Sequence, residues 1–381
     1  MSGRLPRVVH IAKFYPPVGG GMERVVAMLC AATRERVESR VVAYNDGHGT
    51  VRERVGGVPV ARLRTIRFAR STPIAPSLVR ELRALDADVV VLHEPNPWAL
   101  LACALARPKQ PLSIWFHSEV VRPRLQYTLF YHPLVKAVYD RAASIIVSSP
   151  ALAEHAAALR PYGDRVEVIP FGIDTALWSA APPGGVRASA VAVRASGRPI
   201  VLFAGRMVAY KGVGVLLEAL VSVNAYAVIV GDGPLRAAWQ RAARDLNIEE
   251  RVEFPGEVTD DELRALYGCA DVFVLPSVTR AEAFGYVQLE AMAAGLPVIS
   301  TRLPSGVPWV NQHGVTGLTV PPGDAPALAA ALRDLLGDAA MKRRMSAAAR
   351  ARVASEFTLE RMGERASALF TRLAARETVP S

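Results

Sequence analysis

The stretch 272–300 contains the pattern that most constrains the fold of this chain. Val272–Leu275 is a short apolar run that predicts a buried strand. From about Gly285 the apolar residues recur at helical spacing, and Gly295-Leu296-Pro297 ends that helix. Val298–Ser300 then begins another strand. The order is strand, loop, helix, strand, which is the building unit of an α/β fold.

The loop and the first turn of this helix have the properties of an anion site. A helix N-terminus presents unpaired N–H groups and a partial positive charge, and Gly285 lets a ligand approach the backbone closely. Glu282 in the loop and Glu290 in the second helical turn could grip hydroxyl groups on either side of a bound phosphate. The alternative is that Glu282 is an ordinary loop residue and Glu290 an exposed helix residue.

Glu282 and Glu290 are separated by seven residues, with Phe284-Gly285 between them. This spacing resembles the E-x7-E signature of retaining nucleotide-sugar glycosyltransferases with the GT-B fold, those of family four (glycosyl transferases group 1). In that family the first glutamate contacts the transferred sugar and the second binds the nucleotide ribose. The amides between them hold the sugar and the phosphates. The resemblance therefore implies a nucleotide-sugar site made of Glu282, Glu290 and the backbone of Phe284, Gly285, Tyr286 and Val287.

A second motif follows the strand expected at Pro199–Ala204. Gly205-Arg206 and Lys211 stand at the exit of this strand, where an arginine fork and a lysine point charge make a pocket for a diphosphate. The motif is similar to the Gly-Arg-x4-Lys-Gly sequence of the same family. The similarity implies that Gly205 lies in the nucleotide-sugar site and that Arg206 and Lys211 neutralise the leaving diphosphate. Arg206, Lys211 and Glu282 are thus expected to be catalytic.

The N-terminal half has a glycine-rich loop. Gly19, Gly20 and Gly21 follow a strand at Arg7–Ala12 and precede an amphipathic segment, Glu23–Ala32. A loop that feeds a helix N-terminus tolerates phosphate, but contiguous glycines do not match the nicotinamide-cofactor fingerprint. In the resembled family this loop faces the cleft near the phosphates, which implies that Gly20 and Gly21 bind the nucleotide-sugar. The alternative is a loop that is merely mobile.

His117 lies where the strand that starts at Leu112 ends. The carboxyl ends of strands in an open parallel sheet border the crevice where ligands bind. A lone histidine is usually structural, but the resembled family has a functional histidine at this Phe-His-Ser position. The resemblance therefore implies that His117 is catalytic and touches the transferred sugar. Where many relatives have aspartate after the serine, this chain has Glu119.

Composition excludes several classes of protein. The 381 residues are enough for two domains, and 51% hydrophobic residues predict a folded globular protein. The three cysteines stand apart in apolar surroundings, which favours a reducing compartment over a disulfide framework. No apolar run reaches the about 18 residues that a membrane-spanning helix needs, and no signal peptide is expected.

The net charge of +10 is concentrated in the first half. Residues 1–170 contain 23 Lys and Arg against 14 Asp and Glu, a balance of +9, whereas residues 171–381 contain 22 and 21, a balance of +1. The basic half suggests an anionic membrane surface, a lipid diphosphate acceptor or nucleic acid as partner; the alternative is plain solubility. Val120–Tyr139 interleaves basic and aromatic residues, which suit an acceptor or membrane surface or a helix packed on the sheet.

No metal and no cofactor are expected. Asp86-Ala87-Asp88 matches the D-x-D pattern of metal-dependent transferases of another fold. The pattern precedes a strand, however, so a solvated strand entrance is the simpler account. Arg206, Lys211 and the helix N-terminus near Gly285 can neutralise the charge on a leaving diphosphate without a metal.

The predicted fold is α/β of the GT-B type, with two Rossmann-like domains facing a central cleft. The acceptor-side domain would span residues 1–175 and a linker residues 176–198. The nucleotide-sugar-binding domain would span residues 199–357, and a C-terminal helix at 358–381 would cross back to the first domain.

The predicted function is transfer of a hexose, for example from GDP-mannose, to a hydroxyl of a glycan or a polyprenyl-diphosphate-linked acceptor. The anomeric configuration would be retained. One alternative is a sugar-nucleotide epimerase or a phosphorylase on the same fold, and the other is a non-enzymatic binder of an anionic polymer. We expect a cytoplasmic enzyme of polysaccharide biosynthesis, peripheral on the inner face of a membrane, with no nucleic-acid partner.

Overall fold

The chain forms two compact units. The computed structural model describes residues 4–45, 47, 49–69, 72–119, 131–180 and 196–376. The first unit contains Met1–Gly172 together with Leu359–Ser381, and the second contains Ile173–Thr358. The first unit is therefore built from both ends of the chain, and the second from one continuous internal segment.

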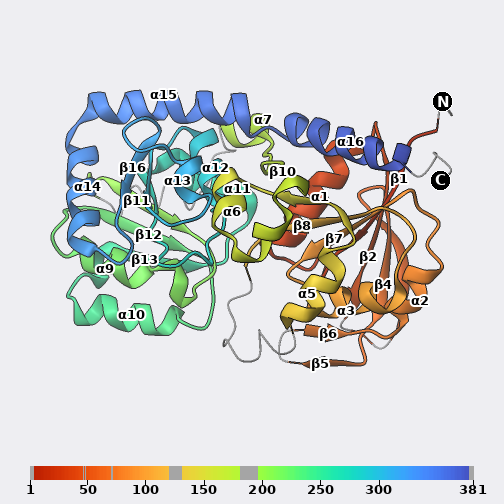
Figure 1. The fold of residues 1–381 in the computed structure, drawn as a ribbon. Helices are drawn as coiled ribbons and strands as arrows, with labels where there is room; N and C mark the ends of the chain where they lie inside the picture. The colour runs from red at the N-terminus through yellow and green to blue at the C-terminus, as the bar shows by residue number, and fades with distance from the viewer. Residues whose placement is uncertain are drawn as a thin grey trace. The chain divides into compact units, whose positions relative to one another are not determined.

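The described part of the first unit has an eight-stranded sheet in the order β10-β9-β8-β7-β1-β2-β4-β3 (Figure 1). All neighbours are parallel except β3 and β4. β7 is buried along its whole length, as expected of an apolar strand covered on both faces. The strands are β1 (Arg7–Ile11), β2 (Glu38–Asn45), β3 (Val51–Val55), β4 (Val58–Arg64), β7 (Val89–Glu94), β8 (Leu112–Phe116), β9 (Ala142–Val147) and β10 (Val166–Val168).

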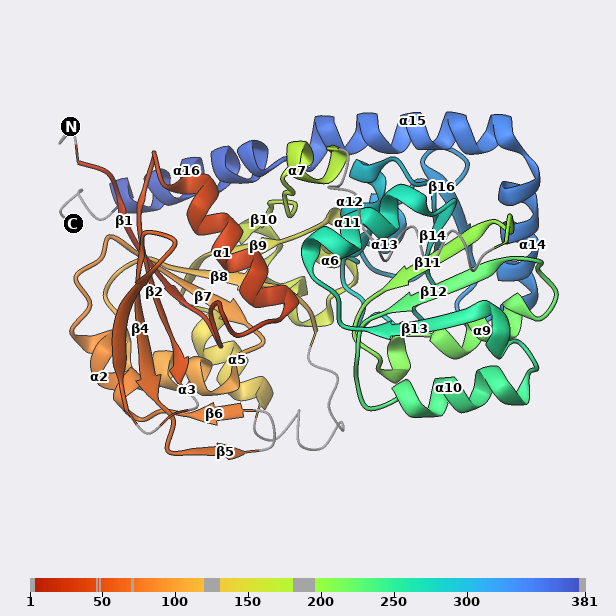
Figure 2. The same ribbon diagram turned by 180° about the vertical axis from the view of Figure 1, so that it is seen from behind.

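Helices and one hairpin complete the first unit. α1 packs against α16, which also contacts β7, whereas α3 packs against α2 and α5 (Figure 2). A separate two-stranded antiparallel hairpin, β5 (Arg67–Ala69) and β6 (Thr72–Ile74), contacts α3 through β6. The helices are α1 (Gly21–Thr33), α2 (Ser77–Arg83), α3 (Pro97–Ala106), α5 (His132–Tyr139), α6 (Pro150–His155), the 3-10 helix η2 (Ala157–Arg165) and α16 (Leu359–Arg376).

The described part of the second unit has a parallel six-stranded sheet in the order β13-β12-β11-β14-β15-β16. The strand order reverses between β11 and β14, because β12 and β13 extend the sheet on one side and β15 and β16 on the other. The strands are β11 (Ile200–Ala204), β12 (Tyr226–Val230), β13 (Val252–Gly256), β14 (Val272–Leu275), β15 (Val298–Thr301) and β16 (Gly317–Val320).

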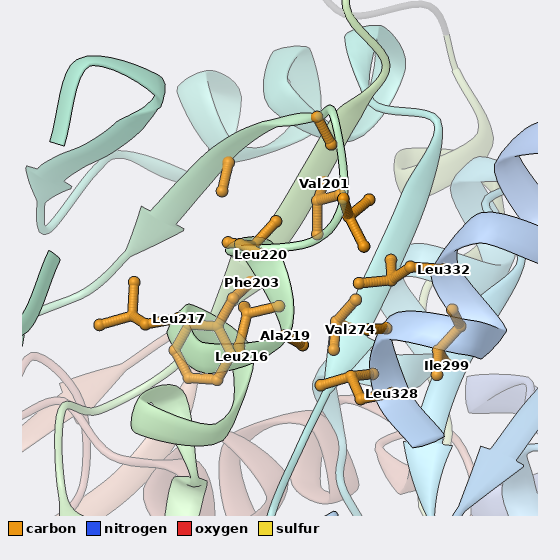
Figure 3. Packing of buried hydrophobic residues seen from close by; sticks show 14 of the residues in the cluster. Val201, Phe203, Leu216, Leu217, Ala219, Leu220, Val274, Ile299, Leu328 and Leu332 are labelled. Carbon is orange, nitrogen blue, oxygen red and sulfur yellow. The ribbon is translucent and has the colours of Figure 1, made fainter. Parts of the chain in front are cut away.

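Helices cover both faces of this sheet (Figure 1). On one face, side chains of α9 and α14 pack on alternate strand residues such as Phe203, Val274 and Ile299, which are buried (Figure 3). α11 contacts β11, α12 contacts β14 and β15, and α15 packs on α12 and contributes Met345 to the core that α9 and α14 cover. The helices are α7 (Thr175–Ser179), η3 (Ala209–Lys211), α9 (Val213–Leu220), α10 (Arg236–Asp245), η4 (Glu249–Arg251), α11 (Asp260–Cys269), α12 (Val287–Ala294), α13 (Val307–Val310), α14 (Ala325–Gly337) and α15 (Ala339–Glu356).

The unit boundary lies a few residues before the expected one. Ile173 pairs with Thr358 in a β-bridge and its amide donates to Phe357 O at 2.8 Å. α7 packs on α12, so the first part of the expected linker 176–198 belongs to the second unit. Residues 181–195 of that linker lie outside the described residues.

Two local features go beyond what the sequence predicts. α6 and η2 are separate because Ala156 between them is extended. The strands β3, β5 and β6 and the helix α3 were not predicted, since no period stands out in their short sequences. Residues 120–130, which interleave basic and aromatic side chains, lie outside the described residues.

The packing of α16 on α1 can be tested at Gly363. A Cβ at this position would lie 2.4 Å from Ala32 O. Gly363→Ala should therefore lower the stability of the first unit by about 1–3 kcal/mol, because the two helix backbones must move apart. Gly214→Ala in α9, where a Cβ meets nothing within 4 Å, is the matched control and should not destabilise. Urea denaturation measures both; equal midpoints for the two variants would contradict the packing.

Candidate functional site

Two loops of the second unit meet at the carboxyl ends of β11 and β14. These strands are parallel neighbours at the point where the strand order reverses, and such points are where open α/β sheets bind ligands. The loop after β11 ends at Gly212, whose φ is +69°. A Cβ there would lie 2.0 Å from Pro276 O, so only glycine permits this close approach. The approach brings Lys211 beside Glu282.

Lys211 and Glu282 form a buried ion pair. Lys211 Nζ lies 2.6 Å from Glu282 Oε2, and the two residues are only 8% and 7% exposed. Ser277 Oγ donates a hydrogen bond of 3.0 Å to the same oxygen. Burial opposes the charge on Lys211, but the attraction of Glu282 outweighs it and raises the lysine pKa. Glu282 Oε1 has no partner among the described residues, so it can accept a further hydrogen bond.

Arg206 is exposed, and the backbone that precedes it lies beside Lys211. Arg206 follows Gly205, on which a Cβ would lie 3.6 Å from Lys211 Nζ. The turn after β12 packs on the same backbone, since a Cβ on Gly231 would lie 2.2 Å from Gly205 O. These contacts fix the backbone that carries Arg206, while its side chain is exposed. Of the two expected cations, Lys211 is thus buried and Arg206 is accessible.

The N-terminus of α12 adjoins Glu282. Gly285 has a φ of +73°, and a Cβ there would lie 2.6 Å from Gln288 Nε2, so only glycine fits. Phe284 and Tyr286 flank this glycine. The amides of Gly285 and Val287 have no acceptor among the described residues. The turn therefore offers two N–H groups and the positive end of the α12 dipole.

Glu290 is placed differently from the expectation. α12 begins at Val287 rather than at about Gly285, so Glu290 lies in the first helical turn and not the second. Its side chain is buried, and Tyr267 donates a hydrogen bond of 3.1 Å to its Oε2. The alternative of an exposed helix residue is therefore wrong.

The glycine loop of the first unit lies at the N-terminus of α1. Gly21 is the first residue of this helix, and Gly20 precedes it in extended conformation. A Cβ on Gly20 would lie 2.1 Å from Glu23 Oε2. The buried Glu23 carboxylate has a raised pKa because burial outweighs the pull of Lys13. The chain's own carboxylate thus occupies the space beside Gly20 where the sequence suggested a phosphate.

His117 directly follows β8 and ends a chain of three histidines in the first unit. Its Nε2 lies 3.0 Å from His93 Nδ1, and His93 Nε2 lies 3.1 Å from His10 Nδ1. All three residues are buried. Burial lowers the pKa of His10 and of His117 to about 3, and burial and the neighbouring rings place that of His93 well below its ordinary value. The three imidazoles are therefore neutral at physiological pH.

Glu94, at the end of β7, is a further buried acid near His117. The His117 amide donates to Glu94 O at 2.9 Å. The Tyr131 hydroxyl and the Asn96 amide each donate a hydrogen bond of 2.9 Å to the Glu94 carboxylate. Burial outweighs these bonds and raises the pKa of Glu94 to about 7. This carboxyl group is partly protonated at neutral pH.

Sequence reasoning missed His10, His93 and Glu94. A signal was present, because His10, His93 and His117 each stand at or just after the carboxyl end of an apolar strand. Only the sheet order, in which β1, β7 and β8 are neighbours, shows that these three positions touch.

The D-x-D candidate is a strand entrance. Asp88 accepts a hydrogen bond of 2.8 Å from the Arg7 amide, and its Oδ1 lies 2.9 Å from Arg4 Nη2. Asp86 also pairs with Arg7. In the described ranges no group of three His, Cys, Asp or Glu side chains could hold a metal ion. No helix found there is long and apolar enough to cross a membrane.

Comparisons with known proteins identify the family. Residues 19–177 match "Glycosyltransferase Family 4" and residues 188–352 match "Glycosyl transferases group 1". The chain is 33% identical to a D-rhamnosyltransferase, WbpZ, of Pseudomonas aeruginosa over 92% of each chain. The chain belongs to the group 1 glycosyltransferases. It is also 28% identical to O-antigen chain mannosyltransferase C of Escherichia coli, over 96% of this glycosyltransferase and 98% of that one.

Solved structures agree on the fold of this glycosyltransferase. Anabaena Alr3699/HepE in complex with UDP superposes with a TM-score of 0.78 at 20% identity, covering 96% of this chain and 100% of that one. WaaG, a glycosyltransferase involved in lipopolysaccharide biosynthesis, has a TM-score of 0.74 at 18% identity, with 96% and 99% covered. The fold is GT-B, with two parallel-sheet α/β domains.

The buried histidines predict that acid destabilises the first unit of this glycosyltransferase. Each binds a proton in the unfolded chain near pH 6.5, but in the folded chain only at a much lower pH, which is about 3 for His10 and His117. The stabilisation from these neutral histidines is therefore complete above about pH 6.5 and is lost as the pH falls. The raised pKa of Glu94 has the opposite effect, because protonation of this carboxyl group stabilises the folded state as the pH falls from about 7 to 4.5. The three histidines together outweigh this one group.

The variant His10→Leu tests whether protonation of the buried histidines destabilises the first unit as the pH falls. Removing one such histidine should reduce the slope of unfolding free energy against pH below about pH 6 by about 1.4 kcal/mol per pH unit. The slope is obtained from urea denaturation at several pH values, with hydrogen exchange in β7 reporting on the first unit. An unchanged slope would show that His10 is protonated in the folded state.

Proposed function

We propose that this glycosyltransferase moves a hexose from a nucleotide diphosphate-sugar to a hydroxyl of a glycan or of a polyprenyl-diphosphate-linked acceptor. The observation that carries the proposal is the Lys211–Glu282 pair at the β11–β14 switch point. Exposed Arg206 and the two open amides of the α12 N-terminus accompany it. Cations and amide dipoles at one edge of a sheet suit a diphosphate.

The chemistry follows from where charge develops. When the glycosidic bond breaks, the diphosphate gains negative charge. Lys211 and the amides of Gly285 and Val287 are held in place before the reaction, and together with the exposed Arg206 they stabilise that charge. Lys211 remains protonated because Glu282 raises its pKa. These groups can do the work of a divalent metal, and we infer that the reaction needs none.

The two glutamates have separate roles in this proposal. Glu282 Oε2 is engaged by Lys211 and Ser277, whereas its Oε1 can accept a hydrogen bond from a hydroxyl of the transferred sugar. Glu290 lies one α12 turn from the open amides, held by Tyr267, and we assign it to the nucleotide ribose. No carboxylate is assigned as a covalent nucleophile. Retention would proceed by front-face attack, with the departing phosphate taking the acceptor's proton.

Mannose chemistry is supported by the relatives. Two are a D-rhamnosyltransferase and an O-antigen chain mannosyltransferase. A third, from Mycobacterium tuberculosis, is a GDP-mannose-dependent α-(1-6)-phosphatidylinositol monomannoside mannosyltransferase, 34% identical over 93% of this chain and 95% of that one. We therefore propose GDP-mannose or a related GDP-hexose as substrate. An epimerase, the rival assignment, would convert the nucleotide-sugar with no acceptor present.

Arg206→Ala is the decisive variant for this proposal. Because Arg206 is exposed, its removal should leave the fold intact and lower turnover of GDP-mannose by about 100-fold or more. Arg343→Ala, an exposed arginine on α15, is the matched control and should keep full activity. Turnover is measured as GDP release, with and without a metal chelator.

The substrate class is checked in the same preparation. GDP-sugars should raise the melting temperature of the wild-type protein, and Arg206→Ala should reduce the shift. Equal turnover by Arg206→Ala and Arg343→Ala, or no thermal shift from any GDP-, UDP-, ADP- or TDP-sugar, would contradict the assignment. Lys211→Ala is a weaker test, because it leaves Glu282 buried without its partner and should itself destabilise the protein.

We also propose that the β5–β6 hairpin contacts an anionic membrane that holds the acceptor. Ile66 and Phe68 are 57% and 46% exposed, and Arg64 and Arg67 beside them are exposed. The Ile66 amide donates to Ile74 O at 2.9 Å, so the hairpin displays these side chains on an ordered backbone. Large apolar side chains beside arginines suit an interface with anionic lipid. Figure 1 shows the hairpin at the rim of its unit, near α3.

Vesicle binding tests this surface. Ile66→Ser/Phe68→Ser should weaken binding to vesicles containing phosphatidylglycerol by about tenfold or more, because less apolar surface can be buried. Val221→Ser, which removes a side chain 50% exposed in the second unit, should bind as the wild type does. Vesicle co-sedimentation at two salt concentrations provides the measurement. Equal binding by the hairpin variant would locate the contact elsewhere.

A further inference from the structure

His117 is hydrogen-bonded to a second buried histidine, His93, and His93 is hydrogen-bonded to a third, His10. The family resemblance implies a role for His117 alone, yet its Nε2 is within hydrogen-bond distance of His93, and His93 is in turn within hydrogen-bond distance of His10. We propose that His93 and His10 are positioning residues that hold the proton of His117 on Nδ1, so that His117 presents a neutral N–H donor to an oxygen of a bound ligand. The role of that donor rests on the proposed function, whereas the position of the proton does not.

The two contacts allow only two proton arrangements. A neutral imidazole has one N–H and one lone pair, and both ring nitrogens of His93 are engaged, at 3.0 and 3.1 Å. If His93 donates from Nδ1 to His117, then His93 Nε2 must accept from His10. If His93 donates from Nε2 to His10, then His93 Nδ1 must accept from His117. In the first arrangement all three protons are on Nδ1, and in the second all are on Nε2.

The buried end of the chain decides between them. His10 Nε2 is buried and has no hydrogen-bond partner among the described residues. The first arrangement leaves a bare lone pair there, whereas the second leaves an N–H. Buried N–H groups without an acceptor are rarer in proteins than buried acceptors without a donor. The proton is therefore expected on Nδ1 of His10, His93 and His117.

Stacking prevents the rings from turning. His93 and Trp115 lie with ring centroids 5.7 Å apart and planes 19° apart, and Trp115 and His117 are 6.2 Å and 19° apart. Phe171 lies 5.6 Å from His117 at 26°. A ring held between aromatic neighbours cannot exchange the positions of its nitrogens without breaking this packing. The hydrogen-bond chain and the stack together fix where the His117 proton points.

The consequence is a chemical role for His117. Its Nδ1 has no partner among the described residues, so this nitrogen is available to a ligand. As a neutral donor it can bind a hydroxyl or phosphate oxygen, and it is not the base that removes the acceptor's proton. This agrees with the proposed mechanism, in which the departing phosphate takes that proton.

Nitrogen NMR of the full-length protein tests the proton position without any substrate. In protein labelled with ¹⁵N-histidine, two-bond nitrogen–proton correlations distinguish an Nδ1–H ring from an Nε2–H ring. The His117 signal, assigned by its loss in His117→Gln, should have the Nδ1–H pattern, as should those of His93 and His10. An Nε2–H pattern at His117 would overturn the proposal.

Two substitutions of His93 test the coupling. The side-chain nitrogen of asparagine is two bonds from Cβ, as Nδ1 is, so His93→Asn can still donate to His117. The nitrogen of glutamine is three bonds from Cβ, as Nε2 is, so His93→Gln loses that donor. His93→Gln should mix the His117 tautomers and lower kcat by about 100-fold, and His93→Asn should keep the Nδ1–H pattern and lose much less.

Equal losses in the two variants with an unchanged His117 pattern would show that His93 is structural only, which overturns the proposal. If the wild-type protein turned over no nucleotide-sugar at all, the proposed function would fail. The NMR pattern would still decide where the His117 proton lies.

Discussion

A lysine ammonium buried against a glutamate carboxylate is the contact around which the second unit is arranged. Removing two charges from water is costly, and apolar residues of the same volume often stabilise a protein better. Here the Lys211–Glu282 pair is retained at a strand-order reversal, and two glycines, at 212 and 285, allow its loops to close around it. Perturbed charged groups at such a place are typical of functional sites. Glu282 Oε2 is engaged in the pair, whereas Glu282 Oε1 can still accept a hydrogen bond. A free acceptor of this kind is consistent with a ligand-binding site.

The two units differ in the charge and the exposure of the polar groups at their strand ends. In the second unit a cation is exposed at Arg206, and amides at the α12 N-terminus have no acceptor in the described structure. In the first unit the polar groups at the carboxyl ends of the strands are buried and largely uncharged. The three histidines have lowered pKa values, and Glu94 has one raised to about 7. The second unit thus contains charged groups at its strand ends, and the first contains neutral hydrogen-bonding groups that are held in set orientations.

The sequence predicts most of the strands and helices, because apolar runs and helical spacing are local properties. The pairing of Lys211 with Glu282 could be expected only through the family resemblance, since the adjacency of β11 and β14 depends on sheet order. The same limit hid the contact between His10, His93 and His117, whose strands are neighbours only in the folded sheet. The two-residue error at the start of α12 changed the placement of Glu290, because a φ of +73° at Gly285 cannot be read from spacing. The glycine loop is a case in which the sequence pattern misleads. Its sequence suits a phosphate, but in the structure the Glu23 carboxylate occupies the space beside Gly20.

The chain passes between the two units twice, after Gly172 and after Thr358. Both passages lie at one β-bridge, because Ile173 pairs with Thr358. The second unit is therefore one continuous segment whose two ends lie next to each other. Recombination between related genes could exchange residues 173–358 as one piece and join them to the first unit of another member of the family. A fragment ending at residue 172 would lack α16 and leave the surface of α1 around Ala32 bare.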